Sequence, residues 1–253
     1  MMLKMLHFKL VMKIFIVTDE RCGGTVFTRI FSDVFNMKTI DDPQTGVNRK
    51  FPNYNKKDNL LDYLFNTLNY EVVKCCFCSF TNEEYFKLLD YCKINKVKII
   101  VLYRENAFDR ALSIAVARTL RNKIKKNNPY SDKSTVLIKP FGYKDTDLIK
   151  PYNLNLNIYE SEIKRYKYDY NRITTYLNIK EIDHFHITFD QCYIDLERID
   201  NFKKLFNWLN LDCDNLEDCH ELNCLLNKDY NTKEANKLIL NFDEVIEINS
   251  KYL

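Results

Sequence analysis

The chain has 253 residues, of which 38 are basic and 35 acidic, so its formal net charge is only +3. This length suits one large domain with a sizeable core and is too short for two such domains. The near balance of charge excludes a global field of the kind that attracts nucleic acid or a membrane surface, so any anion site must be local. We expect a single domain over residues 12–253. Residues 1–11 are interpreted as an extension from an upstream start or as a disordered arm.

Cysteine usage and hydropathy indicate the compartment. Three of the nine cysteines, Cys75, Cys76 and Cys78, crowd one apolar run in which neighbouring side chains face opposite ways, so a disulfide framework is not expected. A reducing cytosol fits better. The apolar start is interrupted by lysines, and no stretch reaches the roughly 18 residues of a membrane span. The expected protein is cytoplasmic, without a signal peptide or transmembrane segment.

Strand and helix patterns alternate along the chain. Continuous apolar runs at residues 71–78 and 96–103 indicate strands buried on both faces, and residues 184–189 alternate like a further strand. Helical spacing follows at residues 25–35, 60–68, 82–92 (after a capping box at 81–84), 106–126, 159–177, 198–209 and 242–252. Residues 41–55 and 127–153 are turn-rich. The alternation predicts a three-layer α/β domain with a mostly parallel central sheet flanked by helices.

The first candidate site is the sequence Arg21-Cys22-Gly23-Gly24-Thr25, between an apolar strand and a helical segment. A helix start offers unpaired N–H groups and the positive end of its dipole, and glycines let a phosphate approach the backbone. Only four glycines occur in the chain, and two of them are here. The loop lacks the lysine of nucleotide triphosphatase P-loops. The alternative is a strand-to-helix turn that binds nothing.

The second candidate site begins at Arg104, at the end of the run 96–103, and continues to Ser113, two turns into the next helix. In an open α/β sheet the ligand crevice lies at these strand ends. An arginine fork and a hydroxyl can hold a phosphate together. The alternative for Arg104 is a surface ion pair with Glu105 or Asp109.

These two stretches resemble motifs of the sulfotransferases that use 3′-phosphoadenosine 5′-phosphosulfate (PAPS), especially the carbohydrate and bacterial glycolipid branches. The loop at 21–25 looks like their R-S-G-[ST]-T loop, and residues 103–113 resemble the 3′-phosphate element Y-R-[DE]-[NP] followed by R-A-x-S. Phe189-Asp190 stands where the family has Tyr-Glu of Y-E-D-L. Residues 202–211 are similar to its F-L-G-L helix, and residues 240–245 to its N-Y-D-E-V-type helix. Residues 127–180 have no recognisable counterpart.

The resemblance implies a P-loop-like domain that transfers a sulfuryl group from PAPS to a hydroxyl of a carbohydrate or glycolipid, releasing the bisphosphate nucleotide PAP. Arg104 and Ser113 would bind the 3′-phosphate. The 5′ end would be bound by Arg21, Cys22, Gly23, Gly24 and Thr25. Arg21 would also stabilise the departing oxygen, as positioned charges do in phosphoryl transfer. The reaction requires no metal. The acceptor and the oligomeric state stay open.

The general base is the point at which the chain departs from the family. Some branches carry His or Glu just after a lysine that matches Lys74, where Cys75 and Cys76 stand here, and the glycolipid branch has Glu at the position of Arg29. The remaining candidate is Asp42, because Asp42-Pro43 lies where carbohydrate sulfotransferases carry Glu-Pro. Asp42 is equally plausible as a turn residue.

Other candidate groups are assigned lesser roles. His184 and His186 are interpreted as structural, and a cysteine base would need a perturbed pKa. The spacing of Cys213, Cys219, His220 and Cys224 fits no common zinc pattern. A basic run at 118–126 is interpreted as a solvated helix end that could also receive an anionic glycan. Two rival functions stay open. A small-molecule kinase is disfavoured by the missing lysine, whereas a nucleotide-binding protein that has lost its chemistry is favoured by the missing base.

Overall fold

The computed structural model describes residues 12–44, 51, 54, 59–127, 151–213, 216–226 and 238–252, with side chains in α5 described as far as Thr119. The expected extension at 1–11, most of the expected loop at 127–153 and the basic side chains at 121–126 lie outside the described residues.

Five parallel strands form one sheet in the order β2-β3-β1-β4-β5. The strands are β1 (Ile14–Thr18), β2 (Thr39–Asp41), β3 (Val72–Cys76), β4 (Lys98–Tyr103) and β5 (His184–Thr188). The predicted α/β class with a parallel sheet is confirmed. From the central strand β1 the chain first builds one side of the sheet and then crosses to the other, so the strand order switches between β1 and β4. In open α/β sheets such a switch leaves a crevice at the carboxyl ends of the strands.

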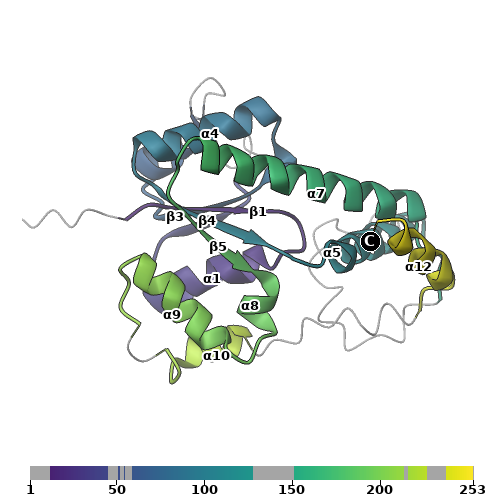
Figure 1. Ribbon diagram of the computed structural model, residues 1–253. Coiled ribbons are helices and arrows are strands. Elements are labelled where there is room, and N and C mark those ends of the chain that lie inside the picture. The colour runs from purple at the N-terminus through teal and green to yellow at the C-terminus, as the bar shows by residue number, and fades with distance from the viewer. Residues whose placement is uncertain are drawn as a thin grey trace, which may run out of the picture.

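Helices cover both faces of this sheet (Figure 1). On one face lie α4 (Asn82–Ile94) and α7 (Leu156–Ile179), and on the other α1 (Gly24–Phe35), α9 (Arg198–Trp208) and α10 (His220–Leu226). The remaining helical elements are α3 (Leu60–Asp62), the π-helical turn η1 (Tyr63–Thr67), the 3-10 turn η2 (Phe77–Ser79), α5 (Ala107–Asn127), α8 (Phe189–Tyr193) and α12 (Phe242–Ser250).

Capping explains two helix boundaries. The predicted capping box of α4 is confirmed, because the Thr81 hydroxyl accepts the Glu84 N–H and the Glu84 carboxylate accepts the Thr81 N–H. The expectation that the late strand includes Phe189 is wrong. A second capping box, between Thr188 and Gln191, starts α8 at Phe189 and turns the chain out of the sheet.

The core is divided by the sheet because alternate residues of a strand face opposite ways. Phe15 and Val17 pack with the apolar side chains of α3, α4 and α7, whereas Ile14 and Ile16 pack with α1, α9 and α10. All five residues of β1 are fully buried. A third cluster joins α5, α7 and α12. Rigid packing on both faces fixes the carboxyl ends of β1, β3 and β4, where the candidate residues lie.

Candidate functional site

The loop after β1 turns directly into α1 through two left-handed residues. Arg21 has φ of 66° and Gly23 has φ of 80°. The Gly23 carbonyl accepts the N–H groups of Val26 at 3.1 Å and Phe27 at 3.0 Å, so Gly23 begins the helix without a side-chain cap. The first N–H groups of α1, from Gly24 and Thr25, have no partner within the helix. The predicted strand-to-helix turn is therefore present, and its helix-start N–H groups are of the kind that can bind an anion.

Neighbouring side chains lie so close to both loop positions that only glycine fits there. A Cβ on Gly23 would lie 2.5 Å from Cε2 of Tyr193, whose hydroxyl donates to the Gly23 carbonyl at 3.0 Å. A Cβ on Gly24 would lie 2.9 Å from Cγ2 of Thr18 and 3.1 Å from Cε of Lys74. The loop is therefore held between α8 and β3, and any larger residue would displace it.

Arg21 connects the first candidate site to the second. Its Nε donates a hydrogen bond to Oγ of Ser113 at 3.1 Å, and Ser113 is almost fully buried in α5. Burial lowers the pKa of Arg21 to about 10, with the nearby Arg104 cation acting in the same direction and Glu20 opposing it. Arg21 is thus a neighbour of both Ser113 and Arg104, although Arg21 follows β1 whereas Arg104 and the helix that carries Ser113 follow β4.

Arg104 follows β4, and the described residues around it do not satisfy all of its hydrogen-bond donors. Its guanidinium carbon lies 4.5 Å from the centroid of the Phe189 ring, and its Nη2 lies 3.8 Å from Oδ2 of Asp109. The contact with Asp109, the alternative expected from sequence, is longer than a hydrogen bond. The Nε of Arg104 is buried and has no hydrogen-bond partner among the described residues. A buried cationic donor without a partner favours an anionic ligand beside it.

Lys74 lies at the candidate site, although no role was expected for it from the sequence. It is 3% exposed, lies against Gly24, and pairs with Oδ1 of Asp41 at 2.6 Å and Oδ2 of Asp42 at 2.5 Å. Asp41 also accepts the Thr25 hydroxyl at 2.6 Å. Burial lowers the pKa of Lys74, but its anionic neighbours raise it to a net value above the ordinary one. A fully charged ammonium therefore lies beside the loop. The sequence signals were a lysine interrupting an apolar strand and its match to a lysine of the resembled family.

Asp42, the candidate base, directly follows β2 and is hydrogen-bonded to β3 beside this lysine. Its backbone is left-handed with φ of 46°, as a turn residue requires, and its Oδ1 accepts the Cys76 N–H at 3.0 Å. Burial raises the pKa of Asp42, but the Lys74 ammonium and three hydrogen bonds outweigh it and leave the pKa below its ordinary value. The carboxylate is thus ionised at neutral pH, but the same contacts make it a weaker proton acceptor than an ordinary aspartate. Lys74 pairs with both Asp42 and Asp41, and Asp41 accepts the Thr25 hydroxyl, so this chain of contacts links Asp42 to the loop.

The two cysteine candidates have pKa values that do not suit the role, and His186 lies within an aromatic cluster. Burial raises the pKa of the Cys75 thiol, and a hydrogen bond of the protonated Cys76 thiol with Cys78, together with burial, raises that of Cys76, so neither is a thiolate at neutral pH. Burial, with His184 adding, lowers the pKa of His186 to about 4. His186 Nδ1 lies 3.2 Å from the Tyr170 hydroxyl within an aromatic cluster.

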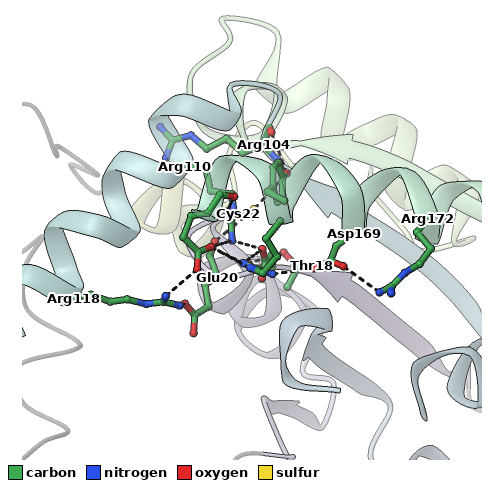
Figure 2. A network of polar contacts seen from close by, with 12 residues as sticks. Thr18, Glu20, Cys22, Arg104, Arg110, Arg118, Asp169 and Arg172 are labelled. Atoms are coloured by element: carbon green, nitrogen blue, oxygen red, sulfur yellow. Dashed lines mark hydrogen bonds and ion pairs between the residues drawn. The ribbon is translucent and has the colours of Figure 1, made fainter. Parts of the chain in front are cut away.

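A buried ionic network anchors the loop to two helices (Figure 2). Arg110 of α5 is fully buried and bonds Asp19, also fully buried, and Oε2 of Glu162 at 3.2 Å. Arg165 of α7 bonds the same Asp19 oxygen at 2.9 Å. Arg118 bridges Oε1 of Glu162 at 2.9 Å and Oε2 of Glu20 at 3.2 Å. The loop that precedes Arg21 is therefore held by four charged side chains from α5 and α7, a role that the sequence motif did not reveal for Arg110.

The comparisons with protein-family models, curated proteins and solved structures find no match. Throughout the described ranges, no helix is both long and apolar enough to cross a bilayer. All nine cysteines are free thiols, and Cys224 Sγ lies 3.4 Å from His220 Nε2. In the part of the chain that the structure covers, no group of three or more side chains is arranged to hold a metal.

Proposed function

We propose that the protein is a PAPS-dependent sulfotransferase that acts on a hydroxyl of a carbohydrate or glycolipid. The observation that carries the proposal is the hydrogen bond from Arg21 to Ser113. It joins the loop resembling the family's 5′ element to the helix resembling its 3′ element. The two elements meet beside the switch in strand order, where open α/β sheets bind nucleotides.

Each phosphate of the nucleotide has candidate donors. Ser113 accepts from Arg21, so its own hydroxyl proton is available to the 3′-phosphate, beside the buried Nε of Arg104, which has no partner within the described ranges. Backbone N–H groups of Cys22, Gly23, Gly24 and Thr25 surround the 5′ end in a P-loop-like manner. Hydrogen bonds from charged donors to phosphate oxygens are short and strong.

The chemistry is an in-line displacement at sulfur. The acceptor oxygen forms a bond to sulfur while the bond from sulfur to the 5′-phosphate oxygen of PAP breaks, and the acceptor proton passes to Asp42. Negative charge builds on the departing oxygen, where Arg21, still protonated at neutral pH, and Lys74 stabilise it. Thr25 and Asp41 connect Lys74 to the loop. No step needs a metal ion.

One observation favours the second candidate, a nucleotide-binding protein without transferase activity. Asp42 is held by Lys74 at 2.5 Å and by the Cys76 N–H at 3.0 Å, contacts that a base must weaken to accept a proton. A kinase is the weaker rival, because residues 21–25 contain no lysine. The nine free thiols support a cytoplasmic location.

Transfer of labelled sulfate from PAPS to a panel of glycans and glycolipids tests the proposal. Label in an acceptor, dependent on Arg21, supports the sulfotransferase. Binding of PAP without transfer to any acceptor favours the inactive nucleotide-binding protein. Absence of PAP binding rejects both.

A further inference from the structure

We propose that Tyr166, in the middle of α7, is a positioning residue that aims Arg104 at the 3′-phosphate and holds the two phosphate-binding elements in a fixed relation. This inference rests on the proposed function. It concerns a helix for which the sequence offers no family counterpart, so no motif assigns a role to Tyr166.

The Tyr166 hydroxyl binds both backbone polar groups of Arg104. It accepts the Arg104 N–H at 2.7 Å and donates to the Arg104 carbonyl at 3.0 Å. Tyr166 is 3% exposed, so these bonds are shielded from water. A single side-chain oxygen therefore fixes the peptide groups on both sides of the Arg104 Cα.

The position of Arg104 explains why such a partner is needed. The ladder between β4 and β5 ends where Tyr103 pairs with Thr188, so Arg104 is the first residue beyond the sheet. Buried backbone groups that leave a sheet need other partners. Tyr166 supplies them and so determines the direction in which the Arg104 side chain leaves the backbone. Productive binding geometry tolerates errors of only about half an ångström.

The same tyrosine also contacts the first phosphate element. Its hydroxyl lies 3.8 Å from Sγ of Cys22, and the guanidinium carbon of Arg110 lies 4.2 Å from its ring centroid. Arg110 in turn pairs with Asp19, directly before the loop. Tyr166 thus lies between the carboxyl ends of β1 and β4 and contacts residues that follow both strands.

The test measures how much the 3′-phosphate contributes to binding. Affinities for PAP and for 5′-AMP, which lacks that phosphate, are determined by calorimetry for wild type, Tyr166→Phe and Tyr159→Phe. Tyr159 is an equally buried tyrosine of α7 whose hydroxyl bonds Asn249, on the side of α12. All titrations contain sucrose, which strengthens the fold of every variant, and urea unfolding checks that each protein is folded.

In wild type and Tyr159→Phe, PAP should bind more tightly than 5′-AMP by the same ratio. In Tyr166→Phe this ratio should fall about tenfold, as expected for losing the bonds that orient a charged ligand-binding group. An unchanged ratio in folded Tyr166→Phe overturns the inference. A wild-type ratio near one, or no PAP binding, is a different result, because it rejects the proposed function itself.

A double-mutant cycle tests whether Tyr166 acts through Arg104. In an Arg104→Ala background, Tyr166→Phe should lower PAP affinity less than twofold further, because the group it positions is gone. Additive losses from the two substitutions would contradict the assignment, since they would show that Tyr166 affects binding independently of Arg104.

Discussion

Arg21 Nε donates a hydrogen bond of 3.1 Å to Oγ of Ser113, joining residues 92 positions apart in the chain. Arg21 belongs to the loop after the central strand β1, and Ser113 to the helix after the neighbouring strand β4. The contact exists because β1 and β4 are adjacent in the sheet, at the point where the strand order switches. The segments that follow the two strands therefore meet at their carboxyl ends. Two separate sequence motifs thereby form one candidate nucleotide site.

Arg104→Ala should weaken PAP binding by roughly 1.5 to 3 kcal/mol, the range for hydrogen bonds to charged groups. Ser113→Ala should weaken it less, because a neutral hydroxyl is the weaker donor. Calorimetric titration of both variants gives the comparison. If Arg104→Ala unfolds the protein while Ser113→Ala binds PAP normally, the arginine is structural and the 3′-phosphate site lies elsewhere.

Asp42→Asn should slow sulfate transfer by about 10²- to 10⁴-fold if the carboxylate is the general base. The amide retains an oxygen for the Cys76 N–H, and Lys74 keeps Asp41 as its partner, so the fold and PAP affinity should persist. The matched control is Asp41→Asn, which leaves one oxygen for either Lys74 or the Thr25 hydroxyl and should raise KM for PAPS more than it lowers kcat. Unchanged turnover in Asp42→Asn removes Asp42 from the mechanism.

Arg110→Met should destabilise the fold by about 3 to 5 kcal/mol, because it leaves the buried carboxylates of Asp19 and Glu162 with fewer partners. Urea unfolding measures the loss. The control is Lys87→Met, which removes an exposed ion pair with Glu83 and should leave stability unchanged. A loss in Arg110→Met as small as that of the control would mean that the network does not stabilise the loop.

The stability should depend on His186 at mildly acidic pH. Its pKa is about 4 in the folded protein against 6.5 ordinarily, so between these values the unfolded chain binds a proton that the folded chain does not. The contribution of neutral His186 to the unfolding free energy is therefore fully present above pH 6.5 and is lost as the pH falls toward 4. His186→Phe should flatten the pH dependence of the unfolding free energy in this window. An equal slope in wild type and His186→Phe would contradict the assignment.

The fold follows from local patterns, and this part could be predicted. Apolar runs identified β3 and β4, an alternating pattern identified β5, and the Thr81 capping box fixed the start of α4, because these signals depend on residues close in sequence. The order of the strands could not be read from such patterns.

The candidate site was only partly predictable for the same reason. Motif spacing singled out Arg21, Arg104 and Ser113. The pairing of Asp19 with Arg110, 91 positions away, and of Tyr166 with Arg104, 62 positions away, arises only when α5 and α7 pack together. The burial of Lys74 beside Gly24 likewise depends on the approach of α1 to β3. Such contacts have no local sequence signal.

The central claim is that the site binds a nucleotide carrying both 3′- and 5′-phosphates, and thermal or chemical unfolding with added ligand tests it most directly. At a hundredfold excess over its dissociation constant, PAP should raise the unfolding free energy of the wild-type protein by about 2.7 kcal/mol. ATP with Mg²⁺ at the same concentration should raise it far less, because it has no 3′-phosphate for Arg104 and Ser113. Equal or greater stabilisation by ATP with Mg²⁺ would contradict the account and favour a phosphoryl transferase.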